Sequence, residues 1–153
     1  MSNCYDSNFL IWQNVKFIIV IVAFFRKEWE KAEVERKMDQ VNVAIADDNE
    51  RMLELLGNII TSDKDLSLVG KANNGEDVYQ IIKTKEPDVV LLDLIMPKVD
   101  GLSVMDMVNK DRTIQKRPDF IIVTAVGQEK ITEDAFRKGA AYYIMKPFRN
   151  EVL

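Results

Sequence analysis

Side chains suited to binding a metal ion or a phosphate group stand where four short apolar runs of this 153-residue chain end. They are, in chain order, Asp47 and Asp48, then Asp93, then Thr124, and finally Lys146. Three carboxylates held close together repel one another, so some stay protonated unless a cation joins them. Hard oxygen ligands suit Mg²⁺, which proteins usually hold with one or two carboxylates, waters and phosphate oxygens. These residue types therefore predict a magnesium site, provided that the fold brings them together.

Asp93 is the predicted reactive group. An aspartate beside a bound metal can accept a phosphoryl group, because aspartyl phosphates are known covalent intermediates. Asp93 follows the run VVLL, which is typical of a strand covered on both faces of a sheet. The metal, the Lys146 ammonium and the Thr124 hydroxyl would then neutralise and bond the oxygens of the transferring group.

Each of these residues also has a plainer explanation. Two aspartates before a helix often cap it, and a lone aspartate after a strand is usually hydrogen-bonded in a turn. Thr124 could be an ordinary strand-end residue, Lys146 a solvated charge and Tyr143 a packing residue. The joint placement of suitable residue types at four strand ends favours the phosphoacceptor interpretation.

Composition excludes several other functions. Because the chain has no histidine, it cannot form a Ser-His-Asp or Cys-His catalytic pair or the usual zinc site with imidazole ligands. It cannot carry phosphohistidine either, so it must receive any phosphoryl group on another residue. The formal net charge of −4 argues against nucleic-acid binding by this chain. Cys4 is the single cysteine, which excludes an intrachain disulfide and fits a cytoplasmic location.

Strands and helices are expected to alternate from residue 41 onward. Apolar strands are predicted at residues 41–46, 66–70, 89–92, 120–123 and 142–145. Between them, apolar stripes at helical spacing predict helices, with the stripes formed by Met52, Leu55, Leu56, Ile59 and Ile60; by Val78, Ile81 and Ile82; by Leu102, Met105 and Val108; and by Ile131, Ala135 and Phe136. Asn74-Gly75 marks the start of the second of these helices. The alternation indicates an α/β fold, a doubly wound five-stranded parallel sheet in which the strand ends carry the chemistry.

Residues 1–37 differ in character from the rest of the chain. Residues 9–25 are strongly apolar, residues 17–25 (FIIVIVAFF) without a break, and residues 26–37 predict a charged helix. A membrane anchor is disfavoured because Gln13, Asn14 and Lys16 interrupt the apolar segment, whereas a spanning helix needs roughly 20 apolar residues. A cleaved signal peptide is disfavoured because no basic residue precedes the apolar segment at residues 9–25. We interpret residues 1–37 as an N-terminal extension, residues 41–153 as the domain, and Met38 as a plausible natural start.

The motifs at the strand ends resemble the receiver domain of bacterial response regulators. The resemblance covers residues 41–148 and rests on Asp47-Asp48, on Asp93 with Met96-Pro97 and Asp100-Gly101, on Thr124-Ala125 and on Lys146-Pro147-Phe148. It implies a flavodoxin-like sheet with strand order 2-1-3-4-5. The segments ADDNE, DLIMPKVDGL, TAVGQE and KGAAYYIMKPF resemble more specifically the branch of this family that controls sporulation in endospore-forming Firmicutes.

The resemblance implies a signalling domain rather than an enzyme, apart from catalysis of its own phosphorylation and dephosphorylation. Asp93 would receive a phosphoryl group from a histidine kinase or a phosphotransfer protein. A homodimer could form on phosphorylation. Membrane and nucleic-acid partners are not expected.

The resemblance also assigns the other site residues. The implied ligands of Mg²⁺, or of another divalent cation such as Ca²⁺ or Mn²⁺, are Asp47, Asp48, Asp93 and the backbone carbonyl of Ile95. The residues implied to contact the phosphoryl group are Thr124 and Lys146, and those implied to switch are Thr124 and Tyr143. The bond before Pro147 is a candidate cis peptide, because proline lowers the cost of the cis form.

The chain departs from the family pattern at both ends. Residues 1–37 match nothing in the family, and the last helix is truncated, since only residues 149–153 remain for it. No DNA-binding domain follows, so gene regulation by this chain alone is not expected. A truncated last helix would leave apolar surface bare beside the first helix. We expect part of residues 9–37 to pack there or to mediate association; the alternative is a disordered extension on an unstable domain.

Three other functions fit parts of the pattern. A phosphatase of the haloacid dehalogenase type also uses an aspartate nucleophile, but it needs a second aspartate two residues later, where this chain has Ile95. A nucleotide-binding Rossmann domain needs glycines after the first strand, and residues 46–49 are ADDN instead. A stand-alone or inactive receiver-like interaction module, with the acids as relics, stays open.

Overall fold

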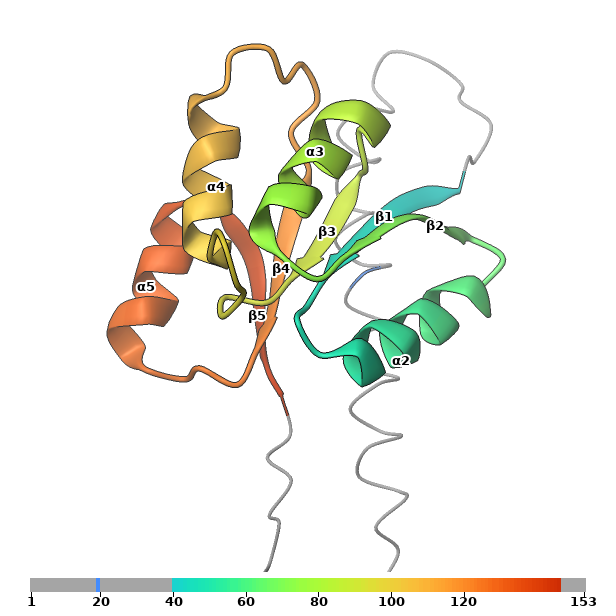
Figure 1. Cartoon of the computed structure of the whole chain (residues 1–153), viewed down its shortest axis with the longest axis horizontal. Helices are drawn as coiled ribbons and strands as arrows, with labels where there is room; N and C mark the ends of the chain where they lie inside the picture. The colour runs from blue at the N-terminus through green and yellow to red at the C-terminus, as the bar shows by residue number, and fades with distance from the viewer. Residues whose placement is uncertain (1–18, 20–39, 147–153) are drawn as a thin grey trace, which may run out of the picture.

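Five parallel strands form one sheet in the order β2-β1-β3-β4-β5 (Figure 1). The computed structural model describes Ile19 and residues 40–146. The strands are β1 (Val41–Ala46), β2 (Leu66–Ala72), β3 (Val89–Leu92), β4 (Asp119–Thr124) and β5 (Ala140–Met145). The helices between them are α2 (Glu50–Thr61), α3 (Gly75–Lys85), α4 (Gly101–Lys110) and α5 (Glu129–Arg137). The predicted fold class and strand order are confirmed.

Backbone pairing sets the strand ends. β1 and β3 have the predicted bounds; β3 is a continuous apolar run, and β1 is apolar apart from Asn42. β2 extends beyond its prediction through Lys71 to Ala72, since these residues pair with the last residues of β1. Lys71 breaks the apolar pattern of the sequence, but its exposed side chain does not prevent its backbone from joining the ladder. β4 and β5 are likewise longer than predicted.

Each face of the sheet carries its own apolar cluster. On one face, which we call the α3–α5 face, β-strand residues such as Val90 and Leu92 pack against α3, α4 and α5. On the other, the α2 face, the buried residues are Ile19, Val41, Val43, Ile45, Leu56, Ile60, Leu66, Val89, Leu91, Ile121 and Val123. Successive residues of β3 alternate between the two clusters, which is why this strand is apolar throughout.

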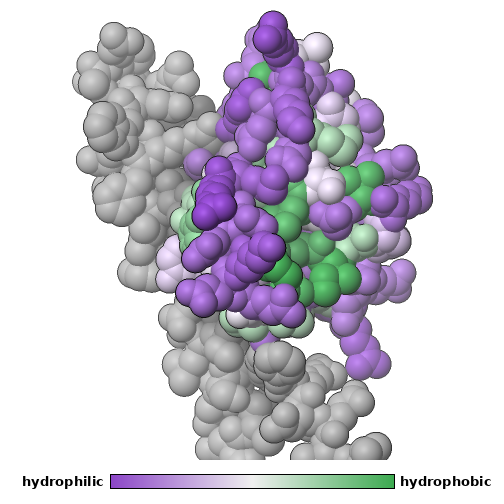
Figure 2. All heavy atoms as spheres, turned by 90° about the vertical axis from the view of Figure 1, so that its left-hand side faces the viewer, coloured by the Kyte–Doolittle hydropathy of each residue, from purple (hydrophilic) through white to green (hydrophobic). Residues whose placement is uncertain are grey.

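Two helical stripes are less buried than their spacing predicts. Leu55 of α2 is 37 % exposed and Phe136 of α5 is 49 % exposed. Both side chains therefore lie partly outside the core. α2 packs on the edge strand β2, and α5 packs on the edge strand β5, so one margin of each stripe extends past the sheet. Figure 2 shows apolar surface framed by hydrophilic side chains on the side of the molecule where α4 and α5 lie.

Several expectations concern residues outside the described part of the chain. These are the charged helix at residues 26–37, the cis bond before Pro147 and the shortened helix at residues 149–153. Among Ile19 and residues 40–146, no helix is long and apolar enough to cross a lipid bilayer.

Candidate functional site

The predicted site residues meet at the carboxyl ends of the strands. The strand order reverses between β1 and β3, and ligands of doubly wound sheets bind in the crevice at such a point. The sheet ladder continues into the site, because the Asp47 N–H donates to the Ala72 carbonyl at 3.0 Å and the Asp93 N–H donates to the Ala46 carbonyl at 2.9 Å. These bonds fix both aspartates at the end of the sheet.

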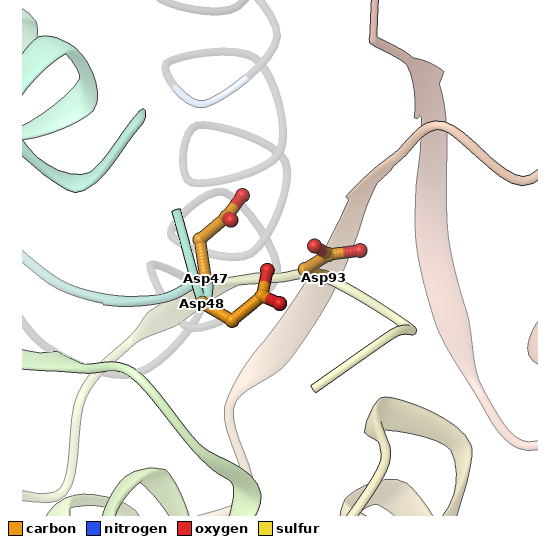
Figure 3. Close-up of side chains that lie close together, drawn as sticks. All are labelled: Asp47, Asp48 and Asp93. Carbon is orange, nitrogen blue, oxygen red and sulfur yellow. The ribbon is translucent and has the colours of Figure 1, made fainter. Parts of the chain in front are cut away.

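Three carboxylates lie close together at this end of the sheet. Asp47 and Asp48 follow β1, and Asp93 follows β3 (Figure 3). One carboxylate oxygen from each lies within 4.8 Å of the other two. Asp47 and Asp93 are buried, with 1 % and 4 % of their surfaces exposed, whereas Asp48 is exposed at the mouth. The predicted convergence of the three aspartates is thus present in the fold.

The Asp93 carboxylate is bound from two neighbouring strand ends. Its Oδ1 accepts a hydrogen bond from the Thr124 hydroxyl at 2.8 Å and one from the Ile95 N–H at 3.2 Å. Its Oδ2 accepts one from Lys146 Nζ at 2.9 Å. Thr124 ends β4 and Lys146 follows β5, so all four predicted strand ends contribute to the site.

Asp47 is less well satisfied. Its Oδ1 accepts a hydrogen bond from the Asn49 N–H at 2.9 Å. Its buried Oδ2 lies 2.6 Å from Lys146 Nζ, but no group of the described residues reaches that oxygen in hydrogen-bonding geometry. Burial raises the pKa of Asp47, and this effect is the largest. The hydrogen bonds from the Lys146 ammonium and the Asn49 N–H lower the pKa in part, whereas the charge of Asp93 raises it further. The carboxylate is therefore held in a position that disfavours its own charge.

Asn49, and not either aspartate, caps α2. Its side-chain oxygen accepts hydrogen bonds from the N–H groups of Arg51 and Met52, at 3.0 and 3.3 Å. The plainer explanation of Asp47 and Asp48 as capping residues is therefore wrong. Both carboxylates lie beside Asp93 instead.

The charges of the site do not balance. Burial tends to lower the pKa of Lys146, but the hydrogen bonds and charges of Asp47 and Asp93 outweigh it, so the pKa is raised and the ammonium is retained. Three ionised carboxylates against this one ammonium leave a formal charge of −2. A divalent cation would cancel that charge, and the oxygen donors are of the hard type that Mg²⁺ prefers. The poorly satisfied Asp47 Oδ2 fits the same role.

A sequence model of the response regulator receiver domain matches residues 43–153. The chain belongs to this family. Receiver domains are signalling domains of two-component response regulators, they interact with histidine kinases and phosphotransfer proteins, and they bind Mg²⁺ at an acidic pocket. Family membership argues against the phosphatase and nucleotide-binding alternatives, which belong to other families.

Solved receiver structures are similar to this chain. The response regulator domain of Thermotoga maritima CheB is 30 % identical, with 71 % of this chain and 79 % of that chain covered and a TM-score of 0.65. A chain of the CheX-CheY-BeF3-Mg+2 complex from Borrelia burgdorferi is 30 % identical, with 72 % and 81 % covered and a TM-score of 0.65. The receiver domain of the putative response regulator NarL from Mycobacterium tuberculosis is 28 % identical, with 72 % and 87 % covered and a TM-score of 0.65.

Gly101 lets the receiver site and α4 approach closely. A Cβ at this position would lie 2.4 Å from the Asp93 carbonyl oxygen and 2.9 Å from the Leu94 Cα, both of which are rigid backbone atoms. The Gly101 N–H also donates to the Leu94 carbonyl at 3.0 Å. Asp100 caps the helix through the Ser103 N–H. The Asp100-Gly101 motif thus anchors α4 directly beneath Asp93.

Val126 is a site residue that the sequence did not reveal. Its N–H donates to the Thr124 hydroxyl oxygen at 3.4 Å, and its carbonyl accepts a hydrogen bond from the Tyr143 hydroxyl. The partly buried Tyr143 ring lies 6.3 Å from the Phe136 ring, and burial raises the pKa of its hydroxyl. Because Val126 acts through its backbone, no side-chain pattern could have indicated it. One peptide segment therefore connects Thr124 to Tyr143.

Two predicted features stay predictions. Ile95 lies at the site through its N–H bond to Asp93, and its side chain is 60 % exposed; its carbonyl as a metal ligand is a proposal. Pro147 lies just outside the described residues.

Proposed function

We propose that Asp93 of this receiver domain accepts a phosphoryl group from the phosphohistidine of a kinase or of a phosphotransfer protein. The observation that carries this proposal is the Asp93 carboxylate bound by Thr124 and Lys146, beside two further carboxylates. An Asp93 oxygen forms the new bond to phosphorus as the phosphorus–nitrogen bond to the donor imidazole breaks. The imidazole leaves with the bonding electron pair and is neutralised by a proton.

Asp47, Asp48, Asp93 and the carbonyl of Ile95 are the proposed ligands of Mg²⁺. When bound, the cation would neutralise charge on the phosphoryl oxygens and on the carboxylates. Lys146 Nζ already lies within 2.9 Å of an Asp93 oxygen, so it can donate to an oxygen of a group attached there. The Thr124 hydroxyl lies 2.8 Å from the other oxygen and can do the same.

The proposed acceptor is tested with acetyl phosphate and Mg²⁺. The wild-type chain should gain one phosphoryl group that is acid-stable and base-labile, measured by intact mass, and Asp93→Asn should gain none. Asp100→Asn is the matched control, because it removes a carboxylate next to α4 while asparagine still caps the helix. Equal modification of Asp93→Asn and wild type would reject Asp93 as the acceptor. No modification of folded wild type would favour the inactive interaction module.

We further propose that Thr124 and Tyr143 form the switch. On phosphorylation the Thr124 hydroxyl would move from the carboxylate to a phosphoryl oxygen, and the Val126 segment would move with it. The Tyr143 hydroxyl, bound to the Val126 carbonyl, would lose or change its partner. The pairing of β4 with β5 supports this coupling, since Ile122 and Tyr143 are direct neighbours.

The switch is tested with Thr124→Ala, and Thr124→Ser serves as the control that keeps the hydroxyl. Both variants should bind beryllofluoride with Mg²⁺, but only the serine variant should show the wild-type shift of the Tyr143 ring signals by NMR. Tyr143→Phe identifies those signals among the four tyrosines. An undiminished Tyr143 shift in Thr124→Ala would contradict the proposed coupling.

The parent protein is proposed to be a sporulation regulator of the stage zero sporulation protein A type, acting in the cytoplasm. The support is the resemblance of TAVGQE and KGAAYYIMKPF to that branch. The measurement is a phosphotransfer profile against the kinases and phosphotransfer proteins of an endospore-forming host. Transfer should be fastest from a phosphotransfer protein of the sporulation pathway, and preferential transfer from an unrelated kinase would contradict this assignment.

A further inference from the structure

Part of the α2 face is buried without help from α2. This helix packs on β1 and β2 and contributes Leu56 and Ile60 to the cluster. Farther across the sheet, Leu91 of β3 and Ile121 and Val123 of β4 are only 1 %, 0 % and 2 % exposed. The other described helices belong to the opposite face. A further apolar element must therefore contribute to covering the β3–β4 part of the α2 face.

Ile19 identifies that element. Its side chain is 0 % exposed and belongs to the same apolar cluster as Leu91, Ile121 and Val123. It precedes β1 by more than twenty positions, so it does not reach the cluster as part of any described strand or helix of the domain. Ile19 lies within residues 17–25, FIIVIVAFF, which contain no charged residue.

We propose that residues 17–25 of the chain's own N-terminal segment dock on the β3–β4 part of the α2 face and complete the core of the receiver domain. The segment would act as an intramolecular packing element. Nine consecutive apolar residues would otherwise expose a patch that soluble proteins rarely tolerate. Residues 26–37 would link the docked segment to β1.

Chain length permits this docking within one molecule. Fifteen residues separate Phe25 from Val41, and an extended chain of that length spans roughly 50 Å. A six-residue strand is only about 20 Å long, so the linker reaches any point of the sheet. Covalent linkage also gives the segment an effective concentration on the order of millimolar, which favours it over a separate partner.

Docking at this position would stabilise the two strands that carry Asp93 and Thr124. Val123 directly precedes Thr124, and Leu91 lies two residues before Asp93. Both apolar side chains contact the cluster that contains Ile19. The segment would thus brace the two strands whose ends carry these site residues, whether or not Asp93 is phosphorylated.

The two tryptophans of the chain provide a direct test. Trp12 and Trp29 are the only tryptophans, and they flank residues 17–25. Urea unfolding of the full-length protein should therefore be followed by tryptophan emission and, in parallel, by far-ultraviolet circular dichroism. Docking predicts coincident transitions, because the segment and the sheet then unfold together. Tryptophan emission that changes well before the sheet unfolds, or shows no transition, would overturn the proposal.

Substitution at Ile19 gives an independent test. Ile19→Ala should lower the Tm by about 10 °C, as expected for an isoleucine removed from a core. The matched control Leu55→Ala removes a similar side chain that is 37 % exposed, and it should lower the Tm by less than about 3 °C. If Ile19→Ala does not fold, Ile19→Val is tested instead. Ile19→Val should lower the Tm by about 3 °C, whereas its control Leu55→Ile should leave the Tm unchanged. Equal shifts at the two positions would overturn the proposal.

Protein concentration distinguishes one molecule from two. Intramolecular docking predicts a urea midpoint that does not change over a hundredfold range of protein concentration. A midpoint that rises with concentration would mean that a second copy supplies the segment, and that result would also overturn the intramolecular proposal.

Discussion

Carboxylates lie at both ends of α4, and they differ in how many partners they have: Asp111 lies at the end of the helix, and three carboxylates lie together near its start. We call Asp111 and the residues bound to it the Asp111 group. At the end of α4, Asp111 accepts hydrogen bonds from the Thr113 N–H and hydroxyl, at 2.8 and 2.6 Å, and from the Tyr79 hydroxyl. Lys83 Nζ lies 3.2 Å from it. The bonds from Thr113 and Tyr79 hold the pKa of Asp111 well below its usual range.

At the start of α4, the site carboxylates have the opposite balance. Asp47, Asp48 and Asp93 share the one ammonium of Lys146, and burial raises the pKa of Asp47. The Asp111 group is a finished structural contact, in which every charge has partners. The site needs a compensating cation, because its three carboxylates share one ammonium and their mutual repulsion opposes folding. A cluster of acids therefore indicates a binding site when its partners are too few.

Mg²⁺ should change the site far more than it changes the Asp111 group. A cation that binds only the folded state stabilises it by mass action, by about 2.7 kcal/mol at a hundredfold excess over Kd, which corresponds to roughly 10 °C in Tm. Asp48→Ala should reduce this rise, measured by calorimetry with and without millimolar Mg²⁺. Asp65→Ala, an exposed aspartate beside the opposite end of the sheet, should leave it unchanged. If Mg²⁺ does not change the wild-type Tm, the site does not need a cation, and it does not differ from the Asp111 group in this respect.

Replacing aspartate by asparagine should change the Tm in opposite directions at Asp47 and at Asp111. Without Mg²⁺, Asp47→Asn should raise the Tm by about 3 °C, because it removes a carboxylate whose charge is disfavoured first by burial and then by the charge of Asp93. Asp111→Asn should lower the Tm, because it removes the charge that Thr113, Tyr79 and Lys83 bind. Thermal unfolding in a chelator measures both variants. Destabilisation by both would show that the site carboxylates are structural after all.

The difference in Tm between wild type and Asp111→Asn should become smaller as the pH is lowered. The pKa of Asp111 is lower in the folded than in the unfolded state, where it is about 3.9. Its stabilising contribution is therefore present above pH 4 and is lost as the pH falls through the folded pKa. The Tm of wild type should exceed that of Asp111→Asn most at pH 7, less at pH 3 and least at pH 2. A difference that stays constant with pH would contradict the assignment of this stabilisation to the Asp111 charge.

The sequence by itself determined the order of strands and helices along the chain and the site residues at the carboxyl ends of the strands. VNVAIA and VVLL were correctly predicted as strands from their short apolar character, and Asn74-Gly75 was recognised as a helix start because capping is a local property. The convergence of Asp47, Asp93 and Thr124 also followed from the sequence, because parallel strands bring their carboxyl ends to one edge of a sheet.

Only the tertiary structure decided which groups touch and how well each is satisfied. That Lys146 lies between Asp47 and Asp93, and that the Val126 backbone joins Thr124 to Tyr143, depends on the distances between separate strand ends. Ile19 is buried because of strands far from it in the chain. Periodicity reports which side of an element is apolar, but the burial of a side chain depends on what the rest of the chain places over it.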